Sequence, residues 1–490
     1  MGHMSIANTG CFYFEGDKKD LVLRRTFQEI VEGQEKEPIA LDLVSICEAI
    51  GSCAFLGDRT IIKNVKRTPW MSNVSFESGD WRTNAPPVHG AKRDSSENIA
   101  SALFHALNRE ILDVVKGKNR IGILLSGGMD SRIVAGILRL IQRAQSSFSV
   151  TVFCWGSRNS RDPVYAERIA NMYDWHFEHF DITAATLKRN IEVCANEGCF
   201  YSANHLHAMP DVADRAKELD MECMIAASYG DSIGRAEYSG TRVMGLPSIE
   251  SRIANNFLLI DPGIYEECKK ASLDEIKRYH GLFGDRRQWE LFELDYQLHY
   301  MRNQLGTCMN VIDKKVPLYQ AFTAIEVVGL MWTYHPECRG DQIYEFLLRL
   351  IDPELIEIPW ARTGKRYLKT DDRPDDLEKR YHKYGKWCRE DLAEYLDELI
   401  FGGELQKTQL LNSNHLRFLL RMNRQFCRTD NRNKIDEISL WLSSLALFLK
   451  HKDWRIEKEI DRKNRGTLRA YWKIVKFAGT FVLKHNWVSR

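Results

Sequence analysis

Short apolar runs alternate with amphipathic stretches through the middle of this 490-residue chain. The runs are rich in β-branched and aromatic residues and have the length of buried strands, whereas the stretches between them repeat apolar residues at helical spacing. The predicted strands are residues 121–125, 148–154, 176–181 and 223–227, and the predicted helices are residues 95–116, 133–140 and 163–173, the last with Asp162 as its N-cap. This alternation predicts an α/β fold, a doubly wound parallel sheet that binds its ligand at the carboxyl ends of the strands.

The flanking regions have other patterns. Residues 4–94 indicate a small β-rich domain with an amphipathic segment at 45–55 and a strand at 60–65, and a polar linker closes it at 84–94. Residues 371–490 are mainly helical and polar. The chain therefore divides into three predicted units, 4–94, 95–370 and 371–490, which is consistent with its length.

Composition excludes several classes. Hydrophobic residues make up 44% and charged residues 28%, with a net charge of +2, which argues against a bulk electrostatic partner. No apolar run reaches 18 residues, so a membrane span is not expected, and Met1–Met4 has the look of an expression scar. The twelve cysteines include no C-x-x-C pair, which favours reduced thiols and a cytoplasmic location over disulfides or zinc.

Candidate chemistry concentrates where the first strand ends, in the run Ser126-Gly127-Gly128-Met129-Asp130-Ser131. Glycines let the backbone turn tightly and approach a ligand. The N-terminus of the following helix offers unpaired N–H groups that suit a phosphate or pyrophosphate. Asp130 stands where a carboxylate could hold the magnesium that accompanies a nucleotide. An ordinary strand-to-helix turn is the alternative, and the accompanying hydroxyls and acid make it the weaker one.

This order of residues resembles the pyrophosphate loop of N-type ATP pyrophosphatases, in the form carried by the asparagine synthetase family. The resemblance implies an adenine nucleotide α-hydrolase-like fold that binds ATP and Mg²⁺. It implies that Ser126, Gly127, Gly128 and Ser131 cradle the pyrophosphate and that Asp130 helps to bind the metal. It also implies a second metal ligand, Asp231, in a loop that includes Gly230, although Ser232 stands where that family has a glutamate.

Further candidates follow from the same resemblance. Leu125 and Phe153, at the ends of neighbouring strands, are expected to wall the adenine. Lys365, or else Arg362, is expected to supply the positive charge that stabilises the leaving pyrophosphate. His205 and His207 lie in a stretch that could face the substrate, although their spacing alone does not make a metal site.

The N-terminal region resembles the last third of the glutaminase domain that precedes the synthetase domain in that family. It is about half as long as such a domain, and Ser5 rather than a cysteine follows Met4. We therefore interpret residues 4–94 as a shortened, degenerate glutaminase-like domain that does not supply ammonia from glutamine.

Together these features predict an ATP- and Mg²⁺-dependent amide ligase. It would adenylate a small-molecule or peptide carboxylate, release AMP and pyrophosphate, and pass the acyl group to an amine without using glutamine. The alternatives are a pyrophosphate-loop enzyme that modifies RNA and a non-catalytic scaffold with a drifted synthetase fold. Residues 451–490 hold 11 Lys/Arg against 4 Asp/Glu, and this basic tail is the feature that would suit nucleic acid.

Overall fold

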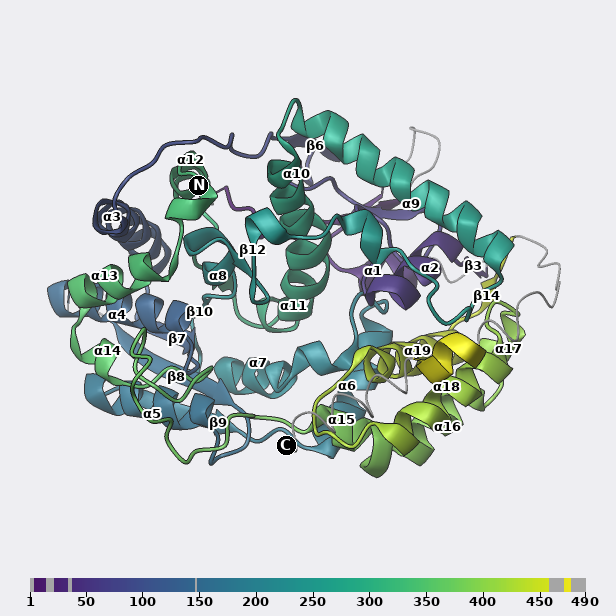
Figure 1. Ribbon diagram of the computed structural model, residues 1–490. Helices are drawn as coiled ribbons and strands as arrows, with labels where there is room; N and C mark the ends of the chain where they lie inside the picture. Colours follow the sequence, from purple (N-terminus) through teal and green to yellow (C-terminus); the bar gives the residue numbers. More distant parts are fainter. Residues whose placement is uncertain (1–3, 15–21, 34–37, 146–147, 458–470, 477–490) are drawn as a thin grey trace.

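The chain contains the predicted parallel sheet, which has five strands and lies toward the left of the view in Figure 1. The computed structural model describes residues 4–14, 22–33, 38–145, 148–457 and 471–476. The strand order is β13-β10-β7-β8-β9, so the chain reverses its direction of growth between β7 and β10. The strands are β7 (Arg120–Leu124), β8 (Ser149–Trp155), β9 (His176–Phe180), β10 (Cys223–Ala226) and β13 (Leu318–Gln320).

Alternate residues of these strands enter two different hydrophobic cores, because successive side chains of a strand point to opposite faces. Ile123 and Val152 face a core built with α3 (Ser96–Val115), α4 (Met129–Gln145) and α5 (Arg161–Tyr173), whereas Leu124 and Phe153 face the other core. The second core takes α6 (Ala184–Asn196), α7 (Met209–Glu218) and α11 (Thr307–Asp313). The loops after the strands therefore emerge between two helical layers.

Two predicted boundaries are wrong for identifiable reasons. Residues 60–65 do not form a strand, because the Thr60 hydroxyl bonds to the carbonyl of Val65 and the N–H of Ile62 and closes a turn. The strand β4 (Val65–Arg67) begins only there. At α5 the N-cap is Ser160, and Asp162 lies inside the helix. Its carboxylate has another partner, described below.

The N-terminal region contributes short strands and two helices, and its buried residues share a core with the parallel sheet. The amphipathic segment is α2 (Leu43–Ser52), capped by Asp42, as predicted. The remaining elements of this region are β1 (Phe12–Phe14), β2 (Leu23–Arg24), α1 (Phe27–Glu32), β3 (Ile39–Ala40), β5 (Ser72–Ser75) and β6 (Asp80–Thr83). Residues 84–94, the predicted linker, contain no helix or strand, and within them His89 is buried and the N–H of Gly90 donates to the carbonyl of Trp332 at 2.8 Å.

The C-terminal region is helical, and its longest helix, α19 (Lys434–His451), is buried along nearly its whole length. It packs on α6 and shares the second core with α2, and β14 (Trp454–Arg455) pairs with β3. The region's other helices are α15 (Tyr384–Lys386), α16 (Ala393–Phe401), α17 (Glu404–Lys407) and α18 (Ser413–Phe426). Most of the basic tail, including Phe477 and Trp487, lies outside the described residues.

The segment between β10 and the C-terminal region, residues 227–370, is mostly helical. It contains α8 (Gly230–Gly234), β11 (Glu237–Tyr238), β12 (Thr241–Arg242), α9 (Pro262–Phe283), α10 (Gln288–Asp295), a π-helical turn at Tyr296–Gly306, α12 (Ile325–Thr333), α13 (Asp341–Ile351) and α14 (Glu354–Glu357). Among the helices that the structure describes, none has the length and apolarity that a bilayer crossing requires.

Candidate active site at the tips of two neighbouring strands

The turn after β7 is held by its own side chains. The N–H of Ser126 donates to the Ser131 hydroxyl at 3.2 Å, and the N–H of Gly128 donates to the Ser126 hydroxyl at the same distance. The two hydroxyls lie 3.2 Å apart. This arrangement leaves a compact loop at the start of α4, where helix N–H groups favour an anion.

Gly127 is required by packing. A Cβ on this residue would lie 2.7 Å from the Cβ of Ala361. Its N–H donates at 3.0 Å to the carboxylate of Asp162, which explains why Asp162 does not cap α5. Burial raises the pKa of Asp162 to about 6, against the opposing effects of this hydrogen bond and of Arg132.

The two predicted metal ligands lie side by side. β10 pairs with β7, so Asp130 at the start of α4 and Asp231 at the start of α8 meet at one edge of the sheet. Gly230 permits their approach, since a Cβ there would stand 2.4 Å from Oδ1 of Asp130. The Tyr344 hydroxyl lies 2.7 Å from Oδ1 of Asp130 and 2.8 Å from the carbonyl of Gly230. Burial, and then the charge of Asp231, raise the pKa of Asp130 well above its usual value.

Arg235 provides the countercharge for this acid pair, and no sequence motif pointed to it. Its guanidinium donates to Asp231 and, at 2.6 Å, to Asp341, and it lies over the ring of Tyr344. Although burial opposes it, the charges of Asp130 and Asp231 raise the pKa of Arg235. The i,i+4 spacing from Asp231 on one short helix is the signal that could have identified it.

A cavity of about 380 Å³ opens on the phosphate loop. Leu125 and Phe153 line it together with Ser126, Gly128 and both acids, so the structure brings most of the predicted nucleotide-binding residues to one place. Gly127 and Gly230 are not among the lining residues, and each allows a close approach of its neighbours, Ala361 and Asp130 respectively. The sequence indicated no ligand-binding role for several other lining residues, which are Trp155, Asp162, Met209, Ser228, Leu305, Met309 and Tyr381.

A second cavity of about 340 Å³ shares Asp130, Asp162 and Asp231 with the first. Four cations, Arg235, Arg362, Lys379 and Arg380, are among its other lining residues, beside apolar and neutral residues such as Trp360 and Ala361. An anion that leaves the phosphate loop would meet these cations at once. The two cavities thus form a shared site with an apolar compartment and a basic one.

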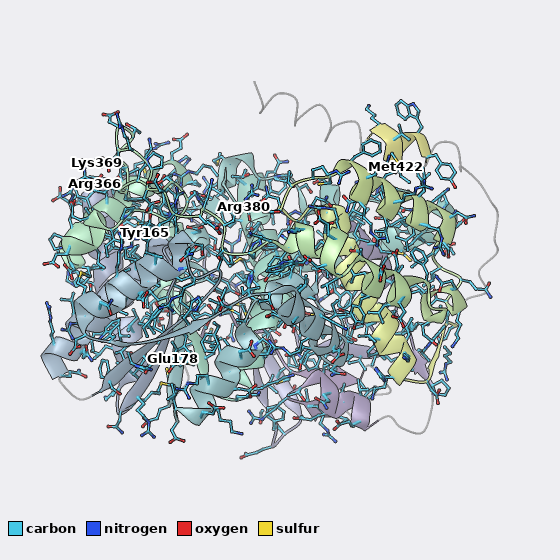
Figure 2. All side chains as sticks on the ribbon, turned by 90° about the horizontal axis from the view of Figure 1, so that it is seen from below. Tyr165, Glu178, Arg366, Lys369, Arg380 and Met422 are labelled. Atoms are coloured by element: carbon cyan, nitrogen blue, oxygen red, sulfur yellow. The ribbon has the colours of Figure 1, made fainter. Side chains whose placement is uncertain are left out.

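Arg362 and Lys365, the two residues predicted to stabilise the leaving pyrophosphate, lie in different surroundings. Arg362 lines the basic cavity, donates to Glu237 at 2.6 Å and approaches Asp231 at 3.9 Å. Lys365 instead donates to the carbonyl of Thr370 at 2.6 Å and is not among the lining residues of either cavity. In Figure 2 its neighbours Arg366 and Lys369 lie at the margin of the molecule, whereas Arg380 lies near the middle.

Ser232, which stands where the resembled family has a glutamate, is buried and turned into the protein. Its hydroxyl bonds to the carbonyl of Tyr229 at 3.2 Å and accepts from the amide of Gln297 at 2.9 Å. A third cavity of about 520 Å³ lies elsewhere, between residues 313–320 and N-terminal residues such as Ser72 and Asn73.

The donor chemistry of the acid pair fits magnesium. Asp130 and Asp231 are two oxygen-donor carboxylates that lie together beside the predicted phosphate loop, Ser126–Ser131, and two protein carboxylates with substrate phosphates are a common Mg²⁺ environment. Within the described ranges no cluster of three or more His, Cys, Asp or Glu residues could hold a metal without such help. The residues therefore suit a metal that arrives with a nucleotide.

The comparisons with known proteins concern the central domain. Residues 102–219, which include the phosphate loop, match the family model for asparagine synthase. A protein of Methanocaldococcus jannaschii that is named as an asparagine synthetase, glutamine-hydrolyzing, is 35% identical over 79 residues, which is 16% of this chain and 14% of that protein. The match thus spans a small part of the relative.

Two solved structures were also found. The U34-tRNA thiolase NcsA from Methanococcus maripaludis is 11% identical over 44% of this chain and 78% of its own, with a TM-score of 0.22. The NMN synthetase from Francisella tularensis is 14% identical over 45% of this chain and 94% of its own, with a TM-score of 0.21. Scores this low do not establish a common fold.

Proposed function

Residues 102–219 belong to the asparagine synthase family, and from this premise we propose that the chain is an ATP-dependent synthetase that joins a carboxylate to an amine. The observation that carries the proposal is the meeting of Asp130 and Asp231 beside the phosphate loop, in one cavity with the apolar residues Leu125 and Phe153. An adenine ring suits the apolar wall, and a triphosphate suits the loop.

The reaction would proceed in two steps. A carboxylate oxygen attacks the α-phosphorus of ATP, the α–β bridging bond breaks, and pyrophosphate leaves. The amine then attacks the acyl carbon, and AMP leaves with the electrons of the acyl–oxygen bond. Magnesium held by Asp130 and Asp231 would neutralise phosphate charge. Arg362 and the other cations of the basic cavity stabilise the charge that grows on the departing pyrophosphate.

The amine is proposed to come from a source other than glutamine. A glutaminase of the resembled kind needs a cysteine thiolate, and residues 4–94 contain Cys11, Cys47 and Cys53. Burial raises the pKa of Cys11 and of Cys53, the latter to about 12, and a hydrogen bond with Cys268 raises that of Cys47. Thiols of this kind are poor nucleophiles at neutral pH.

The test measures pyrophosphate release with ATP, Mg²⁺, an amine and a carboxylate. L-aspartate, L-glutamate and a peptide with an internal aspartate serve as carboxylates, and ammonium or hydroxylamine as the amine. We expect release with at least one carboxylate, no release when glutamine replaces the amine, and loss of release in Asp130→Asn. Asp376→Asn, at an exposed position outside both cavities, is the matched control. Failure to bind ATP at millimolar Mg²⁺ would refute the proposal.

A further inference from the structure

His207 occupies a strained and closely supported position in the wall of the main cavity. It lies between a short 3₁₀ turn (Ala203–Leu206) and α7, with φ 48° and ψ −127°. Residues other than glycine rarely adopt such a backbone conformation. The fully buried Asn190 holds this conformation, since its amide donates to the carbonyl of His207 at 2.8 Å.

Aromatic rings hold the plane of the imidazole. It stacks on Trp155 with 5.7 Å between ring centroids and 18° between planes. The ring centroids of Tyr381, Tyr384 and His382 lie 5.7, 5.8 and 6.3 Å from that of the imidazole. Burial, and then the nearby His382, lower the pKa of His207 well below its usual value. The ring is therefore neutral at physiological pH.

Tyr384 determines which nitrogen carries the proton. Its hydroxyl lies 2.8 Å from Nδ1 of His207, and the tyrosine is 1% exposed. Burial raises the pKa of Tyr384 well above its usual value, so the phenol keeps its proton. A buried O–H must find an acceptor, and Nδ1 is the acceptor found for it within the described chain. Nδ1 therefore accepts, and Nε2 carries the hydrogen and is the polar ring atom left for the cavity.

We propose that His207 is a catalytic hydrogen-bond donor whose Nε2–H stabilises the acyl oxygen as the amine attacks, and that Tyr384 is the positioning residue that sets this tautomer. The inference rests on the proposed function. His207 lines the same cavity as the loop residues Ser126 and Ser131, and its own ring neighbours there are Trp155 and Tyr381.

The step balances without a proton on His207. The amine nitrogen forms a bond to the acyl carbon, and the carbonyl π electrons move onto the oxygen that Nε2–H contacts. They return as AMP departs, and the proton released from the nitrogen passes to water. A neutral donor that is already oriented lowers the barrier because it does not reorganise as the charge develops.

The test compares His207→Ala with His207→Gln. Both variants keep a Cβ on the strained backbone, but only glutamine retains an N–H donor near the position of Nε2. With ATP, Mg²⁺, hydroxylamine and whichever of the three carboxylates releases pyrophosphate with the wild type, we measure hydroxamate formation. We expect kcat to fall about 100-fold in His207→Ala, with KM for ATP little changed, and to stay within about fivefold in His207→Gln. His205→Gln, on the same turn and bonded to Glu437, is the control and should match the wild type.

Tyr384→Phe supplies a second measurement. Without the phenol, the proton of the neutral ring divides between both nitrogens, so kcat should fall about three- to tenfold when His207 is present. It should not fall further in the His207→Gln background. A purely structural role for Tyr384 would lower kcat equally in both backgrounds and would overturn its assignment.

Three results would overturn the role given to His207. Loss in His207→Gln as severe as in His207→Ala would mean that the imidazole acts as a base. A fall of kcat at low pH that the wild type shows and His207→Gln lacks would also mean that the imidazole acts as a base. Wild-type rates in His207→Ala would remove the residue from catalysis. If the wild type itself releases no pyrophosphate with any of the three carboxylates, the proposed function fails first, which is a distinct result.

Discussion

The contact between Gly230 and Asp130 offers the sharpest test of the two-acid site. Replacement of Gly230 by alanine would place a Cβ 2.4 Å from Oδ1 of Asp130, whereas ordinary contact begins at 3.4 Å. The acids must therefore separate by about 1 Å. The backbone of Gly230 has no positive φ, so alanine is tolerated there apart from this clash.

A displacement of this size at a reacting centre costs about 100-fold in rate. We expect Gly230→Ala to lose pyrophosphate release by about that factor and to need more Mg²⁺ for half-maximal rate, because Asp130 and Asp231 no longer share one ion. Overpacking should also lower the free energy of unfolding by about 1–3 kcal/mol. Titration of Mg²⁺ in the pyrophosphate assay and urea unfolding measure the two effects separately.

Gly281, inside α9, is the matched control, since a Cβ there meets nothing within 4 Å. Gly281→Ala should leave the rate and the Mg²⁺ requirement unchanged and stabilise the fold by up to about 1 kcal/mol. If Gly230→Ala kept the wild-type rate and Mg²⁺ requirement while folding normally, the close approach of the two acids would have no part in the chemistry, and the reasoning would be refuted.

Three further predictions concern the surroundings of the loop. Buried Arg132 donates to the carbonyls of Leu355, Ile358 and Pro359. Arg132→Leu should therefore lower the free energy of unfolding, measured in urea, by at least about 3 kcal/mol. A smaller loss would mean that water replaces the guanidinium. Arg362→Ala should slow pyrophosphate release about tenfold or more, whereas Lys365→Ala should slow it less than about threefold. The reverse order would show that the loop carrying Arg362 and Lys365 rearranges when ATP binds. Because the pKa of Asp162 rises from about 3.9 unfolded to about 6 folded, stability should fall by at most about 3 kcal/mol as pH rises from 4 to 6. Asp162→Asn should lack this fall, and parallel stability curves for the two proteins would contradict it.

The sequence predicted the parts of the fold that local patterns encode. The four early strands of the sheet, α3 and the phosphate loop each lie within one short window, where an apolar run or a Ser-Gly-Gly turn has few alternative structures. A metal shared by Asp130 and Asp231 requires β7 and β10 to be neighbours in the sheet, and the two strands are paired in parallel.

The errors arose where a polar side chain had a distant partner. Asp162 fits the pattern of an N-cap, but its carboxylate accepts from Gly127, 35 positions earlier, and Ser160 begins the helix instead. Tyr344 reaches Asp130 across 214 positions. Nothing in either local sequence records such a partner, so spacing rules cannot identify it. Lys365 illustrates the converse, since a basic residue in a glycine-containing loop matched the expected chemistry while its side chain turned to Thr370.

The charge balance of the site explains why these distant partners matter. Asp130 and Asp231 are half-buried carboxylates that lie side by side, and a cation beside them offsets the repulsion between their charges. Arg235, the residue that follows α8, supplies that cation and is itself held by Asp341, so the acid pair is preassembled before any metal or nucleotide arrives. A preassembled pair avoids the cost of bringing two carboxylates together at the moment of binding, which is the condition under which electrostatic stabilisation is most effective. The residues that sequence patterns missed are thus the ones that hold the predicted residues ready to react.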